Sequence, residues 1–340
     1  MIDATRAPAD APTVLVTGGA GFIGSHTCRA LHAEGFRPVV FDDLSNGHAE
    51  FVRWGPLERG DVRDRAALAD AFARHRPVAT VHFAGRIEVG HSVRDPFAHL
   101  DGNVGGSLAV IGAAIESGCD RFVFSSTCAV YGDPVRLPLD ESHPREPINP
   151  YGRSKLMVEQ ALEALEGAGT IRSVRLRYFN AAGAAADGVL GEWHDPESHA
   201  VPLAIEAAMG RREAFTLFGT DYPTPDGSCV RDFVHVEDLA DAHVRAVRHL
   251  LAGGEGGAFN LGTGRGTSVR ELCECVGRHV GRPVPLREAP RRAGDPPVLT
   301  ARADRAWETL GWRATRDLDG TVASAVAWHG RDARPKRAAA

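Results

Sequence analysis

The stretch Thr17-Gly18-Gly19-Ala20-Gly21-Phe22-Ile23-Gly24 decides the fold of this chain. It follows a short β-prone apolar run at 13–17 and opens a segment that we expect to be helical as far as about residue 34. Glycines at every third position allow a tight turn, let the backbone approach a pyrophosphate and let the helix pack on the sheet. The free amides of the helix N-terminus suit phosphate groups. The order of strand, turn and helix predicts a dinucleotide-binding turn.

An acidic residue follows where such a turn requires one. Asp42 lies about 20 residues after the turn, at the end of the apolar run 38–41. We expect its carboxylate to accept hydrogen bonds from the adenosine ribose and to repel a 2′-phosphate, which favours NAD over NADP. Asp43 could share this role. The Gly-Asp-Val turn at 60–62 is a weaker candidate for holding the adenine amino group.

Strands and helices alternate through the first half of the chain. We expect strands at 13–17, 38–41, 79–83, 121–125 and 173–178, and helices at 22–34, 65–75, 103–117 and 151–165. This alternation predicts an α/β fold with a Rossmann-like, doubly wound parallel sheet. After Asn180 the pattern becomes irregular, with loops at 181–199 and 222–228 and a helix at 202–209. A helix at 236–251 and a strand at 258–261 then suggest a return to the main sheet.

The predicted organisation has two lobes. A disordered leader at 1–12 precedes an NAD-binding Rossmann domain at 13–180, which includes a return segment at about 233–262. A smaller α/β lobe at 181–232 and 263–330 would bind the substrate, and 331–340 would be a tail.

The composition of the 340 residues is ordinary for a globular enzyme, with 43% hydrophobic residues and a net charge of −5. Basic residues are scattered, so nothing favours nucleic acid or a membrane surface as a partner. No apolar run approaches the roughly 20 residues that span a bilayer. The six cysteines show no metal-site spacing, so we expect reduced cysteines, no metal and a cytoplasmic protein.

A tyrosine and a lysine, Tyr151 and Lys155, are spaced to share one face of a helix. Tyrosine has a reference pKa of about 10, and a nearby ammonium group would favour its phenolate. Thr127 follows the strand at 121–125, at the sheet edge where the sites of open α/β folds form. Its hydroxyl could bridge a substrate oxygen and the Tyr151 oxygen. The three residues predict proton transfer at a carbinol carbon.

Taken together, these motifs resemble the extended short-chain dehydrogenases. The resemblance rests on Gly18 to Gly24, Asp42, Phe83-Ala84-Gly85, Asn103, Ser125-Ser126-Thr127, Tyr131-Gly132, Tyr151-Gly152-Arg153-Ser154-Lys155 and Tyr178-Phe179-Asn180. Later stretches resemble one branch of that family, the UDP-hexose 4-epimerases. They are Leu217 to Tyr222, Asp226-Gly227, Val230 to Val236, Pro290-Arg291-Arg292 and Gly294-Asp295. The resemblance covers about 13–328.

The resemblance implies NAD-dependent inversion at C4, interconverting UDP-glucose and UDP-galactose through a 4-keto intermediate, by a homodimer with tightly bound NAD. Its catalytic residues would be Tyr151, Lys155 and Thr127. Its cofactor residues would be Gly18, Gly21, Phe22, Ile23, Gly24, Asp42, Asp43, Asn46, Asp61, Val62, Phe83, Ala84, Gly85, Asn103, Tyr151, Lys155 and Tyr178. Its substrate residues would be Thr127, Tyr151, Asn180, His199, Thr216, Leu217, Phe218, Arg231, Arg292, Asp295 and Leu299.

The resemblance also assigns roles within the substrate set. Asn180 and Arg231 would hold the diphosphate, and residues 216–218 would pack on the uracil. Arg292 would bind phosphate, and Asp295 would bind the uridine ribose.

Two positions depart from the family pattern. Ile87 replaces a lysine that many members carry, which puts one cofactor contact in doubt, although Arg86 could substitute for it. Leu299 is intermediate in size at a position where tyrosine restricts the sugar pocket and a small residue admits N-acetyl sugars. We expect a preference for UDP-glucose and UDP-galactose.

Several other functions compete with this one. UDP-N-acetylglucosamine 4-epimerase and UDP-xylose/UDP-arabinose 4-epimerase activities stay open, as does a nucleotide-sensing protein without catalysis. A 4,6-dehydratase requires an acid and a base after the threonine, where this chain has Cys128-Ala129.

Overall fold

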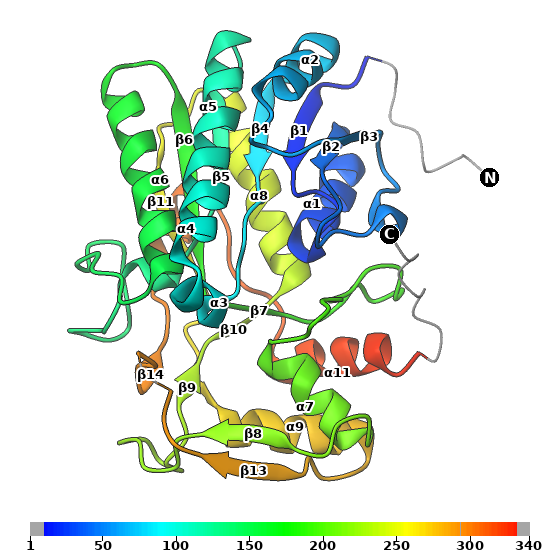
Figure 1. Cartoon of the computed structure of the whole chain (residues 1–340), viewed down its shortest axis with the longest axis vertical. Coiled ribbons are helices and arrows are strands. Elements are labelled where there is room, and N and C mark those ends of the chain that lie inside the picture. The colour runs from blue at the N-terminus through cyan, green and yellow to red at the C-terminus, as the bar shows by residue number, and fades with distance from the viewer. Residues whose placement is uncertain (1–9, 293, 332–340) are drawn as a thin grey trace.

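The computed structural model describes residues 10–292 and 294–331, so most of the expected leader and tail lies outside the described residues. A 7-stranded sheet forms the centre of the molecule, in the order β3-β2-β1-β4-β5-β6-β11 (Figure 1). Every neighbouring pair in it is parallel. Its strands are β1 (Thr13–Thr17), β2 (Arg37–Asp42), β3 (Leu57–Arg59), β4 (Ala79–His82), β5 (Arg121–Thr127), β6 (Arg172–Tyr178) and β11 (Gly257–Leu261). The predicted Rossmann-like, doubly wound sheet is confirmed.

Helices cover both faces of this sheet. On one face lie α1 (Phe22–Ala33) and α8 (Val236–Leu251). On the other lie α2 (Arg65–His75), α5 (Gly106–Glu116) and α6 (Pro150–Gly167). Strand β1 serves both cores because side chains alternate along a strand. Val14 and Val16 pack in the core with α1 and α8, while Leu15 packs in the core with α2, α5 and α6.

Capping residues fix the helix starts that matter for the site. The Asn149 side chain accepts a hydrogen bond from the Gly152 amide at 2.8 Å, and Pro150 occupies the first turn of α6. Asp64 caps α2 in the same way through the amides of Ala66 and Ala67. Both helices therefore begin within a residue of the predicted positions.

The helix expected at 103–117 begins earlier than predicted. Asp95 accepts a hydrogen bond from the Ala98 amide at 3.1 Å and starts α4 (Pro96–His99), with proline in its first turn. A π-helical segment, η2 (Leu100–Gly105), then leads into α5. The Asp95-Pro96 pair is a helix-start signal that the apolar pattern did not reveal. A short helix, α3 (Val89–Arg94), precedes it, and two 3-10 turns lie at η1 (Ala49–Phe51) and η3 (Cys128–Val130).

The chain beyond β6 builds a second cluster of elements below the main sheet in Figure 1. Its helices are α7 (Ala200–Ala208), α9 (Val269–Val280) and α11 (Leu318–His329), and α10 (Asp304–Leu310) lies closer to α8 and β11. Its strand pairs are β8 (Phe215–Phe218) with β13 (Leu286–Ala289), and β7 (Asn180–Ala182) with β10 (Phe233–His235). A small sheet joins β12 (Thr267–Ser268), β9 (Val230–Arg231) and β14 (Val298–Leu299). A smaller α/β lobe was predicted, but two elements lie differently from its predicted bounds: β10 pairs with β7 instead of joining the main sheet, and α10 packs on the main core.

None of the helices that the structure describes has the length and apolar character needed to cross a membrane.

Candidate active site

The glycine turn after β1 packs directly against the loop after β4. Gly18 has a φ of 72°, and a Cβ on it would lie 2.6 Å from the Ala84 amide nitrogen. A Cβ on Gly24 would collide with the Gly18 carbonyl oxygen. Only glycine fits these two positions. The turn is therefore tight and leads directly into α1, the strand-turn-helix arrangement that suits the phosphates of a dinucleotide.

Asp42 ends β2 beside this turn. Its carboxylate accepts hydrogen bonds from the Ala20 amide at 3.0 Å and from the Leu44 amide at 2.9 Å. Burial raises the pKa of Asp42, while these two hydrogen bonds act in the opposite direction. The carboxylate is thus fixed next to the glycine turn, as a ribose-binding acid must be. The other two candidates in this loop, Asp43 and Asn46, are exposed.

The acid of the 60–62 turn is already paired. Asp61 forms an ion pair with Arg63 at 2.6 Å, and Arg63 also pairs with Asp101 at 2.6 Å. The Arg63 hydrogen bonds hold the pKa of Asp61 below its usual value. The Val62 side chain lies where a Cβ on Gly106 would meet it at 2.8 Å. An adenine amino group would have to share Asp61 with this arginine, which the sequence did not indicate.

Asn103 fixes the loop after β4 rather than reaching outward. It is 2% exposed and lies in the π-helical segment. Its Oδ1 accepts from the Arg86 amide at 2.7 Å, and its Nδ2 donates to the Arg86 carbonyl at 3.0 Å and to Ser154 Oγ at 3.0 Å. A Cβ on Gly85 would lie 3.0 Å from Asn103 Oδ1. The side chain thus ties the 83–86 loop to α6, and direct contact with a cofactor stays a prediction.

Lys155 lies in a buried position at the end of β5. Its Nζ donates to the Ser125 carbonyl at 3.0 Å and lies 5.0 Å from the centre of the Phe124 ring. The side chain is 3% exposed. Burial lowers the pKa of Lys155 to about 8. The ammonium group is therefore held by a carbonyl and a ring face, two partners that the sequence did not indicate.

The pKa of Tyr151 differs from the expectation. Burial raises it to about 12, and a hydrogen bond with Thr127 acts against that rise. Among the described residues, Cys128 also raises the pKa of Tyr151, whereas Lys155 has no effect on it. The Lys155 ammonium, directed at the Ser125 carbonyl, does not lower the pKa of the phenol as the helical spacing suggested. The predicted contact between Tyr151 and Thr127 does form.

A second tyrosine lies at the same strand ends. The hydroxyl of Tyr178, at the end of β6, hydrogen-bonds with Ser125 Oγ at the end of β5. Burial raises the pKa of Tyr178, and the neighbouring Tyr151 raises it further. The carboxyl ends of β5 and β6 thus carry Thr127 and Tyr178, and the first turns of α6 bring Tyr151 and Lys155 to the same sheet edge.

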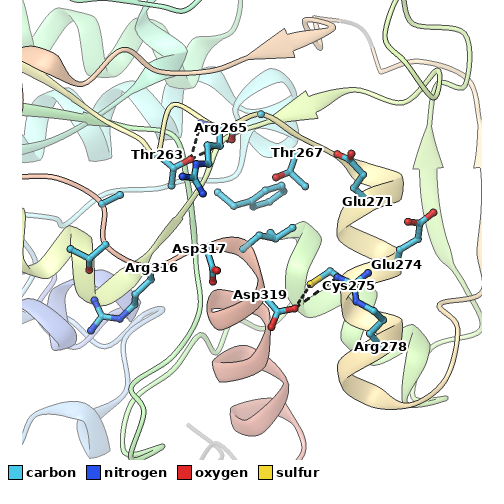
Figure 2. A pocket seen from close by; sticks show the side chains of 15 residues that line it. Thr263, Arg265, Thr267, Glu271, Glu274, Cys275, Arg278, Arg316, Asp317 and Asp319 are labelled. Atoms are coloured by element: carbon cyan, nitrogen blue, oxygen red, sulfur yellow. Dashed lines mark hydrogen bonds and ion pairs between the residues drawn. The ribbon is translucent and has the colours of Figure 1, made fainter.

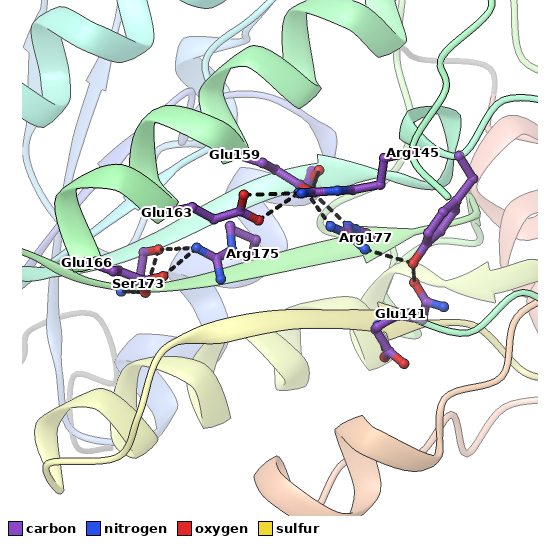
Figure 3. A network of polar contacts seen from close by, with 11 residues as sticks. Glu141, Arg145, Glu159, Glu163, Glu166, Ser173, Arg175 and Arg177 are labelled. Carbon is purple, nitrogen blue, oxygen red and sulfur yellow. Dashed lines mark hydrogen bonds and ion pairs between the residues drawn. The ribbon is translucent and has the colours of Figure 1, made fainter. Parts of the chain in front are cut away.

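A buried polar network links the ends of β5 and β6 to α6 (Figure 3). Ser126 Oγ donates to Glu159 Oε1 at 2.6 Å, and Arg177 Nε donates to the same oxygen at 2.8 Å. Arg177 also donates to the Tyr131 hydroxyl at 3.0 Å. Since Ser126 precedes Thr127, this network fixes the backbone that carries the threonine.

Arg231 and Leu299 lie side by side on the small sheet. Residue 231 in β9 pairs in register with residue 299 in β14. The Arg231 guanidinium donates to the Pro296 carbonyl at 2.9 Å and lies 3.4 Å from the Asp295 carboxylate. Leu299 packs in the cluster that contains Val130, just after Thr127. Two predicted diphosphate and ribose contacts and the predicted sugar-pocket residue are thus brought together.

Only alternate side chains of β8, the predicted uracil segment, are accessible to a ligand. Side chains of Thr216 and Phe218 are half-buried, while Leu217 is 1% exposed in the second core. The Leu217 side chain thus faces the second core, because alternate residues of a strand face opposite sides, and only its backbone is left for the predicted uracil contact. The Arg292 guanidinium lies 3.9 Å from the centre of the Phe218 ring. These two candidates do meet.

The remaining substrate candidates, Asn180 and His199, lie at the starts of β7 and α7. Asn180 begins β7, and its amide donates to the Asp232 carbonyl at 2.9 Å. His199 precedes α7 and lies 2.8 Å from the Glu192 carboxylate. Burial lowers the pKa of His199, but Glu192 and Glu197 outweigh this and raise it to about 10. The His199 ring is thus paired with two carboxylates, Glu192 and Glu197, that the sequence did not indicate.

A cavity of about 600 Å³ opens elsewhere, between α9 and the segment before α11 (Figure 2). Thr263, Arg265, Glu271, Cys275 and Arg316 are among its lining residues, and none of the predicted site residues is. Cationic and anionic side chains are mixed along its wall, so the charge pattern selects no ligand.

Comparisons with known proteins match the chain to characterised ones over nearly its whole length. The model of the NAD dependent epimerase/dehydratase family matches residues 14–262. A UDP-glucose 4-epimerase of Rhizobium meliloti is 58% identical over 94% of this chain and 97% of its own length. The crystal structure of a UDP-glucose 4-epimerase from Brucella ovis in complex with NAD is 50% identical, with a TM-score of 0.92 over 94% of this chain and 99% of that one.

A third similar protein is a UDP-glucose 4-epimerase from Stenotrophomonas maltophila, solved with bound NAD and formylated UDP-arabinopyranose. It is 39% identical, with a TM-score of 0.91 over 94% of this chain and 98% of that chain.

Proposed function

Because this chain belongs to the NAD dependent epimerase/dehydratase family, we propose that it inverts C4 of UDP-hexoses and interconverts UDP-glucose and UDP-galactose. The observation that carries the proposal is the meeting of Thr127, Tyr151 and Lys155 at the carboxyl end of β5. Similar proteins of 58% and 50% identity are named UDP-glucose 4-epimerases, and one is solved with NAD.

The nucleotide end of the site fits NAD. Glycines at 18 and 24 let the turn close tightly on itself and on the 83–84 loop, where a Cβ would collide with backbone atoms, and the Asp42 carboxylate is fixed beside it. We assign this cradle to the cofactor, with Phe22 and Ile23 offering first-turn amides and Phe83 and Ala84 lining the opposite loop. When bound, NAD supplies the acceptor and donor for the C4 hydride, so the sugar passes through a 4-keto form.

The chain's own residues handle the proton. Tyr151 takes the proton of the 4-hydroxyl and returns it, and Thr127 holds the phenol oxygen by a hydrogen bond. The protein alone leaves Tyr151 a neutral phenol, with a pKa of about 12. Bound oxidised NAD would supply a positive charge that favours the phenolate, so the strength of Tyr151 as a base would depend on the cofactor. Lys155 is held by the Ser125 carbonyl, and its remaining N–H groups would donate to the nicotinamide ribose.

The uridine diphosphate has to be bound firmly, whereas the sugar ring has to be able to rotate in the site. We assign the uridine diphosphate to Asn180, Arg231, Arg292 and Asp295, because arginine pairs with two phosphate oxygens in a planar fork. Thr216 and Phe218 face the uracil. Leu299 is the apolar side chain next to Arg231, and it bounds the sugar without fixing its orientation. A firm grip on the diphosphate with a loose grip on the sugar lets either face of C4 be presented.

We also assign the two lobes to the two ligands. Residues 13–180 with the return segment at 233–262 would carry NAD, and 181–232 with 263–330 would carry the UDP-sugar. The catalytic proton groups belong to the first part, while Arg231, Asp295 and Leu299 belong to the second. The division explains why the reaction requires both.

A homodimer through the helices at 103–117 and 151–165 also belongs to the proposal, with the enzyme acting in the cytoplasm. Large apolar side chains lie exposed on this side of the molecule, from α3 to α6: Val93, Phe97, Leu108 and Met157. Phe97 is 75% exposed and Val93 63%. Light scattering of the purified chain should give twice the mass of one chain, and Phe97→Asp should reduce it to one.

Incubating the purified protein with UDP-galactose, without added NAD, tests the main proposal. UDP-glucose should appear, because the cofactor stays bound through each cycle. If no product forms even with NAD supplied, the proposal is wrong.

UDP-pentoses are the second candidate substrates, since a similar enzyme was solved with formylated UDP-arabinopyranose. Parallel assays with UDP-xylose and with UDP-N-acetylglucosamine measure the sugar range that Leu299 permits. Turnover of either comparable to that of UDP-galactose would contradict the proposed preference.

A further inference from the structure

Four potential metal ligands converge in the segment between β7 and α7. They are Glu192, His194, Glu197 and His199, and their ligand atoms all lie within 4.8 Å of one another. We call them the His2Glu2 cluster. The cysteine spacing that argued against a metal does not bear on it. The Glu-x-His-x-x-Glu-x-His pattern is visible in the sequence and could have been noticed there.

Four nitrogen-to-oxygen distances within the His2Glu2 cluster lie near the value expected around a tetrahedral ion. From His199 Nδ1, the nearest oxygens of Glu192 and Glu197 lie at 2.8 and 3.3 Å. From His194 Nδ1, they lie at 3.4 and 3.9 Å. Bonds of about 2.0–2.2 Å to a tetrahedral zinc place neighbouring ligand atoms about 3.4 Å apart. The four observed separations bracket this value.

The ring nitrogens of both histidines face the two carboxylates. His194 Nδ1 and His199 Nδ1 are buried atoms. A carboxylate oxygen of Glu192 lies 2.8 Å from His199 Nδ1 and 3.4 Å from His194 Nδ1. When the rings are deprotonated, the same nitrogens would direct their lone pairs at the space between the four side chains. This is the arrangement that a metal between the four side chains requires.

The surroundings hold the ligands in place. Glu197 Oε1 accepts hydrogen bonds from the Ser198 amide at 2.8 Å and the His199 amide at 2.9 Å. The Glu192 carbonyl accepts from Trp328 Nε1 at 2.8 Å. The Trp193 ring stacks on His48 at 3.9 Å. Metal sites depend on such outer contacts to orient their ligands.

We propose that the His2Glu2 cluster binds one zinc ion as a closed structural site. Nitrogen and carboxylate ligands in a four-coordinate arrangement suit zinc, whereas magnesium and calcium prefer six or more oxygens. The ion would join the segment at 192–194 to the start of α7. It would thereby fix the connection that leads from Asn180 into the second core. His199 would then contribute to the site of the proposed reaction only through its backbone.

A second cluster in the same chain provides a matched control. Cys275, His279 and Asp319 also lie close together, but His279 and Asp319 are exposed. There the His279 Nε2 atom has an ordinary hydrogen-bond contact with Asp319 Oδ1 at 3.0 Å. Only three ligands are offered. We therefore expect His279→Ala to leave the metal content unchanged.

The test is metal analysis of the full-length protein by inductively coupled plasma mass spectrometry after extensive dialysis. Wild type and His279→Ala should retain one zinc per chain, while His194→Ala and Glu197→Gln should not. Glu197→Gln keeps the side-chain shape and an oxygen for the two amides, so loss of metal in this variant does not report misfolding. Circular dichroism should show the same helix content in all four proteins.

Titration of the chelated protein adds a second readout that does not depend on activity. Removing one ligand should weaken zinc binding by at least about 100-fold, beyond the effect of losing an outer contact. Cobalt added in place of zinc should give the visible absorption of a tetrahedral ion in wild type and in His279→Ala. The proposal is overturned if wild type neither retains nor takes up zinc, or if His194→Ala and Glu197→Gln bind it as tightly as wild type.

Discussion

Two buried arginines, Arg177 and Arg231, differ in how completely the protein satisfies them. Arg177 is 2% exposed and donates to Glu159 and to the Tyr131 hydroxyl, with Glu159 itself fully buried. Arg231 is 8% exposed and donates to two carbonyls, and its nearest carboxylate, on Asp295, lies at 3.4 Å. A saturated guanidinium has no capacity left for a ligand. The comparison separates an arginine that stabilises the sheet from one that is available to a phosphate.

Lys155 is a third kind of buried cation. Its contacts are the Ser125 carbonyl and the Phe124 ring, and burial alone lowers its pKa. Cations that lack a carboxylate partner cost free energy to bury. Of the three buried cations, Lys155 lies next to the proposed reacting atoms and lacks a carboxylate partner. Hydrogen bonds to the ribose hydroxyls of a bound cofactor would offset the free energy of burying its charge.

The largest effect is expected from the proton-transfer group beside Lys155. Tyr151→Phe removes the phenol oxygen and should lower kcat by about 10²- to 10⁴-fold, the usual contribution of general acid–base catalysis. Steady-state assays with UDP-galactose measure it. Bound NAD and the melting temperature should stay as in wild type. A variant that retained wild-type kcat would remove Tyr151 from the mechanism.

Arg177→Met should destabilise the fold rather than impair binding. Among the described residues, this leaves the buried Glu159 carboxylate with one ion-pair partner, Arg145, at 3.3 Å. Breaking a buried ion pair costs about 3–5 kcal/mol of unfolding free energy. Urea unfolding measures this loss.

The double variant Arg177→Met with Glu159→Leu serves as the control, because replacing both charges by apolar groups is often neutral. If the double variant is no more stable than Arg177→Met alone, the ion pair is not the source of the effect.

Lys155 should give the unfolding free energy a distinctive pH dependence. Its pKa is about 8 in the folded chain, and the unfolded value is about 10.5. Between these values the unfolded chain binds more protons, so stability should rise with pH by up to about 3 kcal/mol. Unfolding measured from pH 7 to 10 in wild type and Lys155→Met checks this.

The difference in stability between Lys155→Met and wild type should be largest at the acid end and shrink as the pH rises. Catalysis should fall over the same range as the ammonium form is lost. Parallel curves for the two proteins would show that Lys155 does not titrate there.

Arg231→Lys should have the smallest of these effects. It keeps a positive charge but loses the planar fork, so the KM for UDP-galactose should rise by about tenfold, the equivalent of one charged hydrogen bond. Stability should change by less than about 1 kcal/mol. Arg29→Lys, in a surface ion pair with Asp187, is the control and should alter neither quantity. An unchanged KM in Arg231→Lys would place the phosphate elsewhere.

Much of the fold was predictable because its signals are local. The glycine turn, the Asn149-Pro150 helix start and the alternation of strands and helices are read over short spans. Asp95-Pro96 is such a signal too, although the apolar pattern hid it. The short strands of the second region, such as β8 and β9, were not predicted. Strands of two to four residues have too few positions to show an alternating pattern.

The candidate site was predictable in its membership but not in its interactions. The sequence brought forward Tyr151, Lys155 and Thr127, and the structure brings them to one sheet edge. It could not show that Lys155 points at the Ser125 carbonyl or that Leu217 lies in the core. Those facts depend on which face of each element is covered by another.

The sequence by itself determined the strands and helices around the main sheet, the nucleotide turn and the residue types able to transfer a proton, because each rests on neighbours along the chain. Only the tertiary structure decided the electrostatics. Burial sets the pKa values of Tyr151 and Lys155, and partners far away in sequence decide whether Arg177 or Arg231 is saturated. Charge depends on solvent and on neighbours in space, and neither is encoded in a local pattern.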